Sequence, residues 1–354
     1  MKIRTGQPNV KLTETEFKER YLQQFYDPTF SSAEEELKKI THIAWQNYSA
    51  GRKAPLTEKA GPKFKNPDYD LSVEWKKAHK TLNKLERDQK KSKKPVFLII
   101  CASPRNEHTC PSELSKTFRL SKMAEKKIHA EGFQTEFLDL SRLTSEYGKK
   151  IYPCKACVST AMPLCHWPCS CYPNHSLGQT QDWMNEIYQM WVRAAGVMII
   201  TPVHWYQSPS PLKLMMDRLV CADGGNPDPT STDGKDPKLA KQIELKGWDY
   251  PKHLKGRAFS VIVHGDTTGD ENLRRSLVDW LHDLELIDSG PLATINRYIG
   301  YYEPYATSHD ALDKDVQIKE EVELAARALV ARVKQIKNGT FKPAERGLEE
   351  IRKK

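Results

Sequence analysis

Hydroxyl and guanidinium side chains follow an apolar run at residues 96–101. Ser103, Arg105 and Thr109 come directly after this run, and a helical pattern begins a few residues later. Hydroxyls and backbone N–H groups at the start of a helix hold phosphate well, and arginine adds planar, charge-assisted donors. The segment lacks the glycines of GxGxxG and the Lys-Ser/Thr pair of a Walker A loop. We therefore expect a phosphate-binding loop of another kind, with an ordinary polar strand end as the alternative.

An aromatic loop bounded by prolines is the second candidate for chemistry. Its consecutive residues are Pro202, Val203, His204, Trp205 and Tyr206. Adjacent aromatic rings held by prolines form a flat wall that suits a planar ligand. Packing in the core or between subunits is the alternative use of the same rings.

A third loop follows a later apolar run and contains His264, Gly265 and Asp266. Glycine lets the backbone approach a ligand closely, and a polar run at a strand end can hydrogen-bond the edge of a planar ring. We expect this loop to complete a ligand pocket, and a plain surface turn is the alternative.

Cysteine gives a further signal, because five of the eight cysteines lie between residues 154 and 171. A CxxC pair within a compact group of thiolates suits zinc or an iron-sulfur cluster. Free or redox-active thiols are the third interpretation. Cys101 and Cys221 are expected in the core. The candidate metal ligands are Cys154, Cys157, Cys165, Cys169 and Cys171.

Regular alternation of strands and helices is expected to position these loops. Apolar runs predict strands at residues 96–101, 133–140, 197–201, 258–264 and 292–295. Amphipathic patterns predict helices at residues 112–131, 181–195, 210–220, 271–286 and 316–336, the second ending at Gly196. This alternation predicts an α/β three-layer sandwich with a five-stranded parallel sheet in the flavodoxin-like order 2-1-3-4-5. In that order a ligand lies outside the carboxyl ends of strands 1 and 3.

Composition divides the chain into three parts. Residues 1–94 read as a basic helical arm with helices at 13–25, 32–48 and 71–87, and residues 51–70 as irregular chain. Residues 95–340 read as the main domain, with a long loop insertion at 223–256, and residues 341–354 as a charged tail. The arm is expected to wrap around the domain or a partner subunit.

The net charge of +9 comes almost entirely from the arm. Residues 1–95 hold 21 Lys and Arg against 13 Asp and Glu, which leaves 34 against 33 in the remainder. We interpret the excess as a solvated hinge, because the sequence carries no nucleic-acid recognition motif. No apolar run approaches the roughly 20 residues of a membrane span, and no secretory signal is evident. These features predict a soluble, cytoplasmic protein without a membrane partner.

Three segments together resemble the NAD(P)H-dependent FMN reductase family. They are Ser103-Pro104-Arg105 after the first strand, Thr201-Pro202-Val203-His204-Trp205, and Lys213 with Asp217-Arg218. Two residues depart from the family pattern, Ala102 in place of a usual glycine and His204 in place of a frequent tyrosine. The resemblance implies FMN phosphate at Ser103, Arg105 and Thr109. It places the flavin ring against Pro202, Val203, His204 and Trp205, with Tyr206 in the same loop and residues 264–266 bordering the flavin.

The activity implied by this resemblance is an FMN-dependent oxidoreductase. NAD(P)H would be the hydride-donating co-substrate, and a quinone, flavin, nitro compound or similar small molecule the electron acceptor. The cysteine group resembles that of iron-sulfur flavoproteins, which implies a 4Fe–4S cluster, although the seven-residue gap after Cys157 departs from their tighter spacing. The family analogy also implies a homodimer or homotetramer.

Two other functions remain open at this stage. One is a non-catalytic electron-transfer flavoprotein that exchanges electrons through the cysteine cluster. The other is a zinc-stabilised binding module that keeps the scaffold without flavin and uses the basic arm for nucleic acid.

Overall fold

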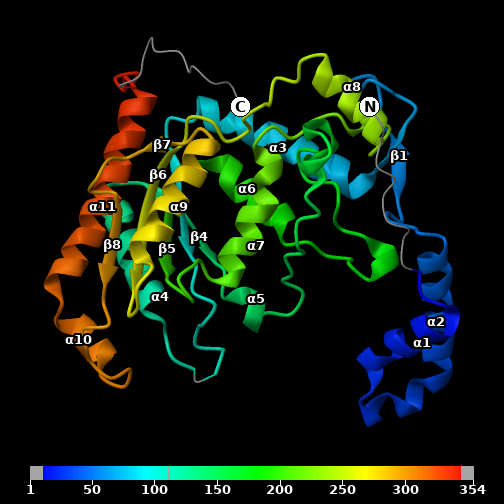
Figure 1. Cartoon of the computed structure of the whole chain (residues 1–354), viewed down its shortest axis with the longest axis horizontal. Coiled ribbons are helices and arrows are strands. Elements are labelled where there is room, and N and C mark those ends of the chain that lie inside the picture. The colour runs from blue at the N-terminus through cyan, green and yellow to red at the C-terminus, as the bar shows by residue number, and fades with distance from the viewer. Residues whose placement is uncertain (1–10, 111, 344–354) are drawn as a thin grey trace. The chain divides into compact units, whose positions relative to one another are not determined.

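The computed structural model describes residues 11–110 and 112–343 (Figure 1). Their contacts define two compact units. The arm unit comprises residues 11–79, 155–182 and 226–249, and the sheet unit comprises residues 80–154, 183–225 and 250–343. The sequence-based division at residues 94 and 340 rests on composition and stays a prediction. Residues 344–354 of the charged tail lie outside the described residues.

The sheet unit is built on a fully parallel sheet, as expected for an α/β sandwich. Its order is β4-β3-β5-β6-β7, with β8 also paired to β6. The strands are β3 (Val96–Cys101), β4 (Gln134–Asp139), β5 (Ala194–Pro202), β6 (Ala258–Gly265), β7 (Ile287–Asp288) and β8 (Thr294–Tyr298).

The predicted count of five strands is wrong, because the sheet has six. The short strands β7 and β8 pair with successive parts of β6, at residues 258–259 and 261–265. A turn separates them, in which Gly290 has a φ of +103° and accepts a hydrogen bond from Ala293 at 2.9 Å. The last position of the expected order is therefore shared by two short strands.

Helices cover both faces of this sheet. On one face, α4 (Lys116–Ala130) and α11 (Val316–Lys337) bury apolar side chains against Phe97, Ile99 and Met198. Side chains alternate along a strand, so Leu98 and Ile100 point to the opposite face. There α6 (Met184–Arg193) and α9 (Asp270–Asp283) meet through the edge-to-face rings of Trp191 and Trp280. The remaining helices of the unit are α5 (Arg142–Ser145), α7 (Ser210–Arg218) and α10 (Ser308–Lys314).

Gly196 does not end a helix, contrary to the sequence-based expectation. Helix α6 ends at Arg193, and β5 begins at the next residue. A Cβ on Gly196 would lie 2.9 Å from a ring carbon of Phe97 and 2.9 Å from a methyl of Val333. The glycine therefore serves the close packing of α11 on the sheet.

The arm unit combines two helices with an antiparallel strand pair. These are α1 (Glu14–Leu22), α2 (Glu34–Ser49), β1 (Thr57–Lys59) and β2 (Asp70–Ser72), followed by the start of α3 (Val73–Lys91). Ala60, Leu71 and Trp75 form its small apolar core. The segment from 226 to 249, which contains α8 (Pro237–Leu245), folds within this unit together with the cysteine loop.

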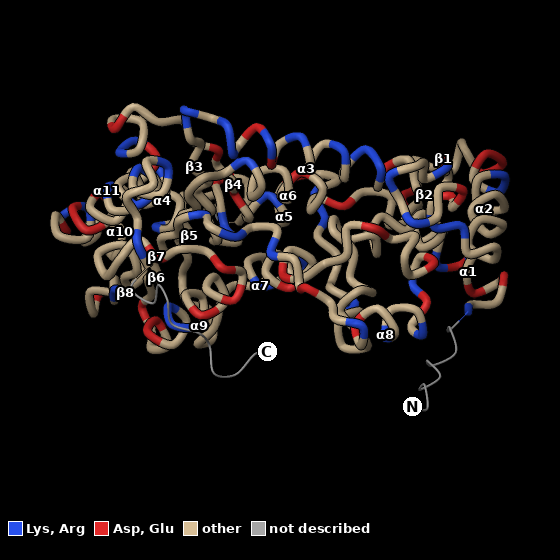
Figure 2. The backbone as a smooth tube through the Cα atoms, turned by 90° about the horizontal axis from the view of Figure 1, so that it is seen from above, with Lys and Arg blue, Asp and Glu red and all other residues tan. Residues whose placement is uncertain are grey.

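Lys and Arg recur along α3, as the tube in Figure 2 shows. Some of these side chains are paired locally, for example Lys76 with Glu58 at 2.7 Å and Lys90 with Glu86 at 2.7 Å. Such exposed pairs contribute little to stability and are typical of a solvated helix face. Among the described residues, no helix combines the length and apolar character needed to cross a bilayer.

Candidate functional site

A cavity of about 480 Å³ opens where β3, β5 and β6 end. All three loops singled out in the sequence contribute to its wall. Their lining residues are Ser103, Pro104, Arg105, Pro202, Val203, His204, His264, Gly265 and Asp266. The parallel strands place these carboxyl-terminal loops at one edge of the sheet.

Other parts of the sheet unit complete the wall, and sequence reasoning missed them. They come from the start of α4 and from the chain after β8: Glu113, Ser115, Lys116, Thr117, Ile299, Tyr305, Ser308 and His309. The capping position of α4 was a usable signal, because Ser115 accepts a hydrogen bond from the N–H of Phe118 at 3.1 Å. The residues after β8 lie too far along the chain for any local pattern to place them.

The loop after β3 forms the end of the cavity that is richest in hydrogen-bond donors. Ser103 is buried, and its hydroxyl accepts a hydrogen bond from the N–H of Arg105 at 3.2 Å. The Arg105 guanidinium contacts the Glu113 carboxylate at 3.1 Å. Thr109 lies outside the lining, because its hydroxyl closes a turn with the N–H of Asn106 at 3.1 Å. Its expected contact with phosphate stays a prediction.

Lys116 places a cation at the start of α4. Its ammonium donates a hydrogen bond to the carbonyl of Ile299 at 2.8 Å. Burial lowers the pKa of Lys116, while the nearby Asp266 carboxylate opposes that shift. The backbone N–H groups of Lys116 and Thr117 belong to the first turn of α4, where a helix provides no acceptor of its own. This end of the wall therefore combines a cation with open helix-start donors.

His264 ties two walls of the cavity together. Its Nε2 lies 2.8 Å from the hydroxyl oxygen of Thr117. Its carbonyl accepts a hydrogen bond from the N–H of Val203 at 2.9 Å. Burial, with the neighbouring Lys116 charge, lowers the pKa of His264 to about 3. The imidazole is therefore neutral and links β6 to α4, while the His264 carbonyl links β6 to the aromatic loop.

The aromatic loop is a tight turn, and its Trp205 and Tyr206 rings lie outside the cavity lining. His204 and Gln207 exchange backbone hydrogen bonds of 2.9 Å, and the two residues between them have left-handed φ values. Trp205 has a φ of +46° and is 92% exposed, and Tyr206 has a φ of +65° and is 56% exposed. Only Pro202, Val203 and His204 of this loop line the cavity. Contact of the Trp205 and Tyr206 rings with a flavin stays a prediction.

The five-cysteine metal site is not assembled in the described part of the chain. Residues 11–110 and 112–343 contain no group of three or more His, Cys, Asp or Glu side chains placed to hold a metal ion. The Lys235 ammonium instead donates a hydrogen bond to Cys157 Sγ at 3.3 Å. A cation in contact with the thiol opposes metal binding there by charge repulsion. Cys101 and Cys221 are buried, as expected.

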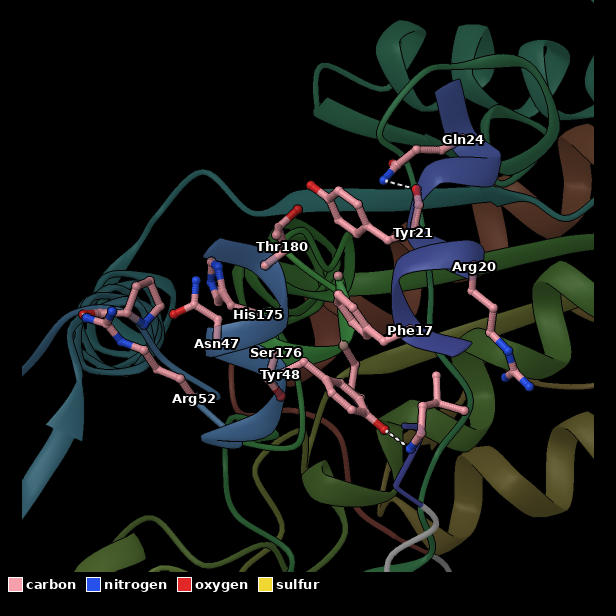
Figure 3. Close-up of a pocket in the computed structure, with 15 residues that line it drawn as sticks. Phe17, Arg20, Tyr21, Gln24, Asn47, Tyr48, Arg52, His175, Ser176 and Thr180 are labelled. Atoms are coloured by element: carbon pink, nitrogen blue, oxygen red, sulfur yellow. Dashed lines mark hydrogen bonds between the residues drawn. The ribbon is translucent and has the colours of Figure 1, made fainter. Parts of the chain in front are cut away.

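A second cavity, of about 720 Å³, lies within the arm unit (Figure 3). Aromatic rings of α1 and α2 form part of its wall, with the Phe17 and Tyr48 ring centroids 4.8 Å apart. The Tyr48 hydroxyl accepts a hydrogen bond from the N–H of Leu12 at 2.8 Å. No local sequence pattern predicts this cavity, because its wall joins the arm to residues 175–180.

Several solved protein structures are similar to this chain. At 14% identity, a crystal structure of RosB with a bound intermediate, 8-demethyl-8-formylriboflavin-5'-phosphate, covers 70% of this chain and 82% of its own, with a TM-score of 0.49. An FMN-dependent NADH-azoreductase from Bacillus anthracis str. Ames Ancestor, in complex with FMN, is 18% identical and covers 66% of this chain and 99% of its own, with a TM-score of 0.37. Among curated proteins, none matches the sequence.

The sequence model of one protein family, described as NADPH-dependent FMN reductase, matches residues 95–290. That match spans more than half of the chain and includes the strands β3, β5 and β6 with their three loops. The chain belongs to the NADPH-dependent FMN reductase family.

Proposed function

We propose that this protein is an oxidoreductase that binds FMN in the 480 Å³ cavity, takes hydride from NAD(P)H and reduces a small acceptor such as a quinone, flavin or nitro compound. One observation carries the proposal. A single cavity, most of whose wall lies within the family region, joins donors suited to a phosphate with an apolar wall suited to a flat ring.

The donor end fits a phosphate monoester. It offers the Ser103 hydroxyl, the Arg105 guanidinium and the Lys116 ammonium beside the first turn of α4. A helix N-terminus favours negative charge, and guanidinium and ammonium groups add charge-assisted hydrogen bonds. The Glu113 carboxylate lies 3.1 Å from Arg105, which supports a role of this guanidinium in binding an oxyanion.

Other residues of the wall fit the ring system. Pro202, Val203 and Ile299 give it apolar surface, and the Gly265–Asp266 backbone supplies polar groups at its edge. A volume of about 480 Å³ lies within the range of roughly 300–1,000 Å³ that is typical of cavities for ligands of this size. Shape and donor set therefore both agree with FMN.

Bound FMN supplies the redox chemistry itself, since flavins accept hydride and pass electrons to an acceptor. The residues of this chain bind and orient. Ser103, Arg105 and Lys116 bind the phosphate, and Val203 and Ile299 exclude water from the ring. Burial lowers the pKa of His204, although Asp266 opposes that shift, so a neutral imidazole faces the cavity. A neutral imidazole can accept or donate a hydrogen bond to the ligand.

FMN titration of the purified full chain, followed by fluorescence quenching, tests the site. Arg105→Met removes a charge-assisted contact worth about 1.5–3 kcal/mol, so the FMN Kd should rise about 10- to 100-fold. Arg275→Met on α9 is the matched control, because Arg275 lies in an exposed pair with Asp279 outside the cavity. Equal affinities for both variants and the wild type would refute phosphate binding by Arg105.

Anaerobic addition of NADH or NADPH to the FMN-loaded protein tests the activity. The flavin absorbance should bleach within the mixing time of a stopped-flow experiment and recover when a quinone is added. Failure of both nucleotides to bleach bound FMN would identify an electron carrier instead. Failure to bind FMN at all would defeat the proposal.

A further inference from the structure

We propose that Cys157 and Cys171 form a redox-active dithiol that reacts with low-molecular-weight disulfides. Their sulfur atoms lie 3.5 Å apart. Both residues belong to the arm unit, and neither lines the cavity proposed for FMN. This second reactive site is independent of the proposed flavin chemistry.

The separation of the two sulfurs is close to that of a disulfide. A disulfide bond is about 2.05 Å long, so the sulfurs need to approach by roughly 1.5 Å. Cys157 begins a single 3-10 turn that ends at Ser159, and Cys171 lies in irregular chain. Neither residue is held within a long helix or a strand, so a shift of this size breaks no regular hydrogen-bond ladder. Cys157 is partly exposed, which gives a small reagent access, whereas Cys171 is only 6% exposed.

Lysine side chains supply positive charge beside the pair. The Lys235 ammonium donates hydrogen bonds to Cys157 Sγ at 3.3 Å and to the carbonyl of Leu164 at 3.0 Å. The Lys53 ammonium donates a hydrogen bond to the carbonyl of Ser170, the residue before Cys171. Cations near a thiol favour the thiolate, which is the nucleophile in disulfide exchange.

Hydrogen bonds of His166 hold this arrangement together. Its Nδ1 lies 2.6 Å from the Ser170 hydroxyl, and its Nε2 lies 3.2 Å from the Thr232 hydroxyl. The buried imidazole thereby joins the loop that carries Cys171 to the segment that carries Lys235. The cation is positioned next to the pair by the fold, although it lies 64 residues beyond Cys171 in the sequence.

The reaction is a two-step exchange. The thiolate of the pair attacks one sulfur of the small disulfide, which forms a mixed disulfide and releases one small thiolate. The second cysteine then loses its proton to solvent and attacks the protein sulfur of the mixed disulfide. The Cys157–Cys171 bond forms and the second small thiolate leaves. In total, two electrons pass from the cysteine pair to the small disulfide, which departs as two thiolates that take up protons from solvent.

Mass mapping of the reduced full chain after exposure to glutathione disulfide tests the proposal. The expected product in the wild type is a linked pair of peptides that contain Cys157 and Cys171. The exposed Cys110 lies outside the group, so Cys110→Ser should give the same product. Cys171→Ser should lack the link and retain one glutathione adduct on Cys157. Cys157→Ser should also lack the link, whereas Cys169→Ser should keep it, because Cys169 is the other thiol that hydrogen-bonds to Cys171. A trapped adduct on Cys157 would not arise from a merely structural pair.

The rate of link formation tests the role of the cation. Lys235→Gln should slow it about tenfold, because the cation that hydrogen-bonds to Cys157 Sγ is lost, and Lys235→Arg should retain most of the rate. Lys238→Gln, an exposed lysine of α8, is the control. A link through Cys169 in place of Cys157, or no link in the wild type, would overturn the proposal. So would a stoichiometric metal ion that protects both cysteines of the reduced protein from alkylation.

Discussion

The Nε2 atom of His264 lies 2.8 Å from the hydroxyl oxygen of Thr117, and both side chains are buried. This hydrogen bond joins the carboxyl end of β6 to the first turn of α4. One contact between side chains thus joins the loop after β6 to the helix α4, and both elements border the cavity. The geometry of the whole cavity depends on it.

Replacing Thr117 tests this link. Thr117→Val keeps the shape but leaves a buried imidazole nitrogen without its partner, which should lower the free energy of unfolding by about 1–3 kcal/mol. Thr117→Ser keeps the hydroxyl and should cost much less. Urea denaturation measures both changes. The FMN Kd should rise when the hydrogen bond is lost. Equal stability of the valine and serine variants would contradict the link.

Acid should destabilise the protein through His264. Its pKa in the folded chain, about 3, lies below the ordinary value of 6.5. As the pH falls between these values, the unfolded chain binds a proton that the folded chain does not, so unfolding becomes favourable. Above pH 6.5 His264 makes its full contribution to the free energy of unfolding. Below pH 6.5 that contribution falls by up to about 1.4 kcal/mol per pH unit.

His264→Gln isolates this effect from the other groups that titrate in the same range. Glutamine can still hydrogen-bond Thr117 but does not titrate. Urea denaturation at a series of pH values between about 4 and 7 should show a flatter loss of stability in the variant. Parallel curves for the two proteins would show that His264 does not carry the dependence.

Removal of Glu113 should strengthen FMN binding. Its carboxylate pairs with Arg105 at 3.1 Å and would compete with a phosphate for the same guanidinium. Pairs at this level of exposure contribute about 0.2–1 kcal/mol, so Glu113→Gln should lower the FMN Kd by about twofold to fivefold. Glu271→Gln at the start of α9 is the control, because Glu271 does not line the cavity. A weaker affinity in Glu113→Gln would mean that Glu113 positions Arg105 instead of competing with the ligand.

Trp205→Asn tests whether the Trp205 ring contacts the flavin. Asparagine tolerates the left-handed φ of +46° better than tryptophan, so the free energy of unfolding should stay unchanged or rise by up to about 1 kcal/mol. The indole is 92% exposed and off the cavity wall, so the FMN Kd should change by less than about twofold. A tenfold weaker Kd would instead support the contact between Trp205 and flavin that the family resemblance implies.

Local sequence was sufficient to predict the strands that carry the site. The apolar runs that became β3 and β6 are parallel strands buried along their whole length apart from Val96, and burial on both faces selects such runs directly. Because parallel strands end at one edge of a sheet, Ser103, Val203 and His264 could be expected around one cavity. The same reasoning did not reveal Lys116, Ile299 or Tyr305, since their places depend on how α4 and the chain after β8 pack on the sheet.

The cysteine group shows where sequence reasoning ends. Spacing alone determined that several thiols lie close together, because five cysteines within a short segment have little room to separate. Only the tertiary structure decided that Cys157 meets Cys171 and that Lys235 lies against the pair. Spacing shows how many cysteines lie in the segment. It shows neither where their side chains point nor which charge a distant segment brings beside them. This cation in contact with sulfur favours the ionised form of the thiol and repels a metal ion.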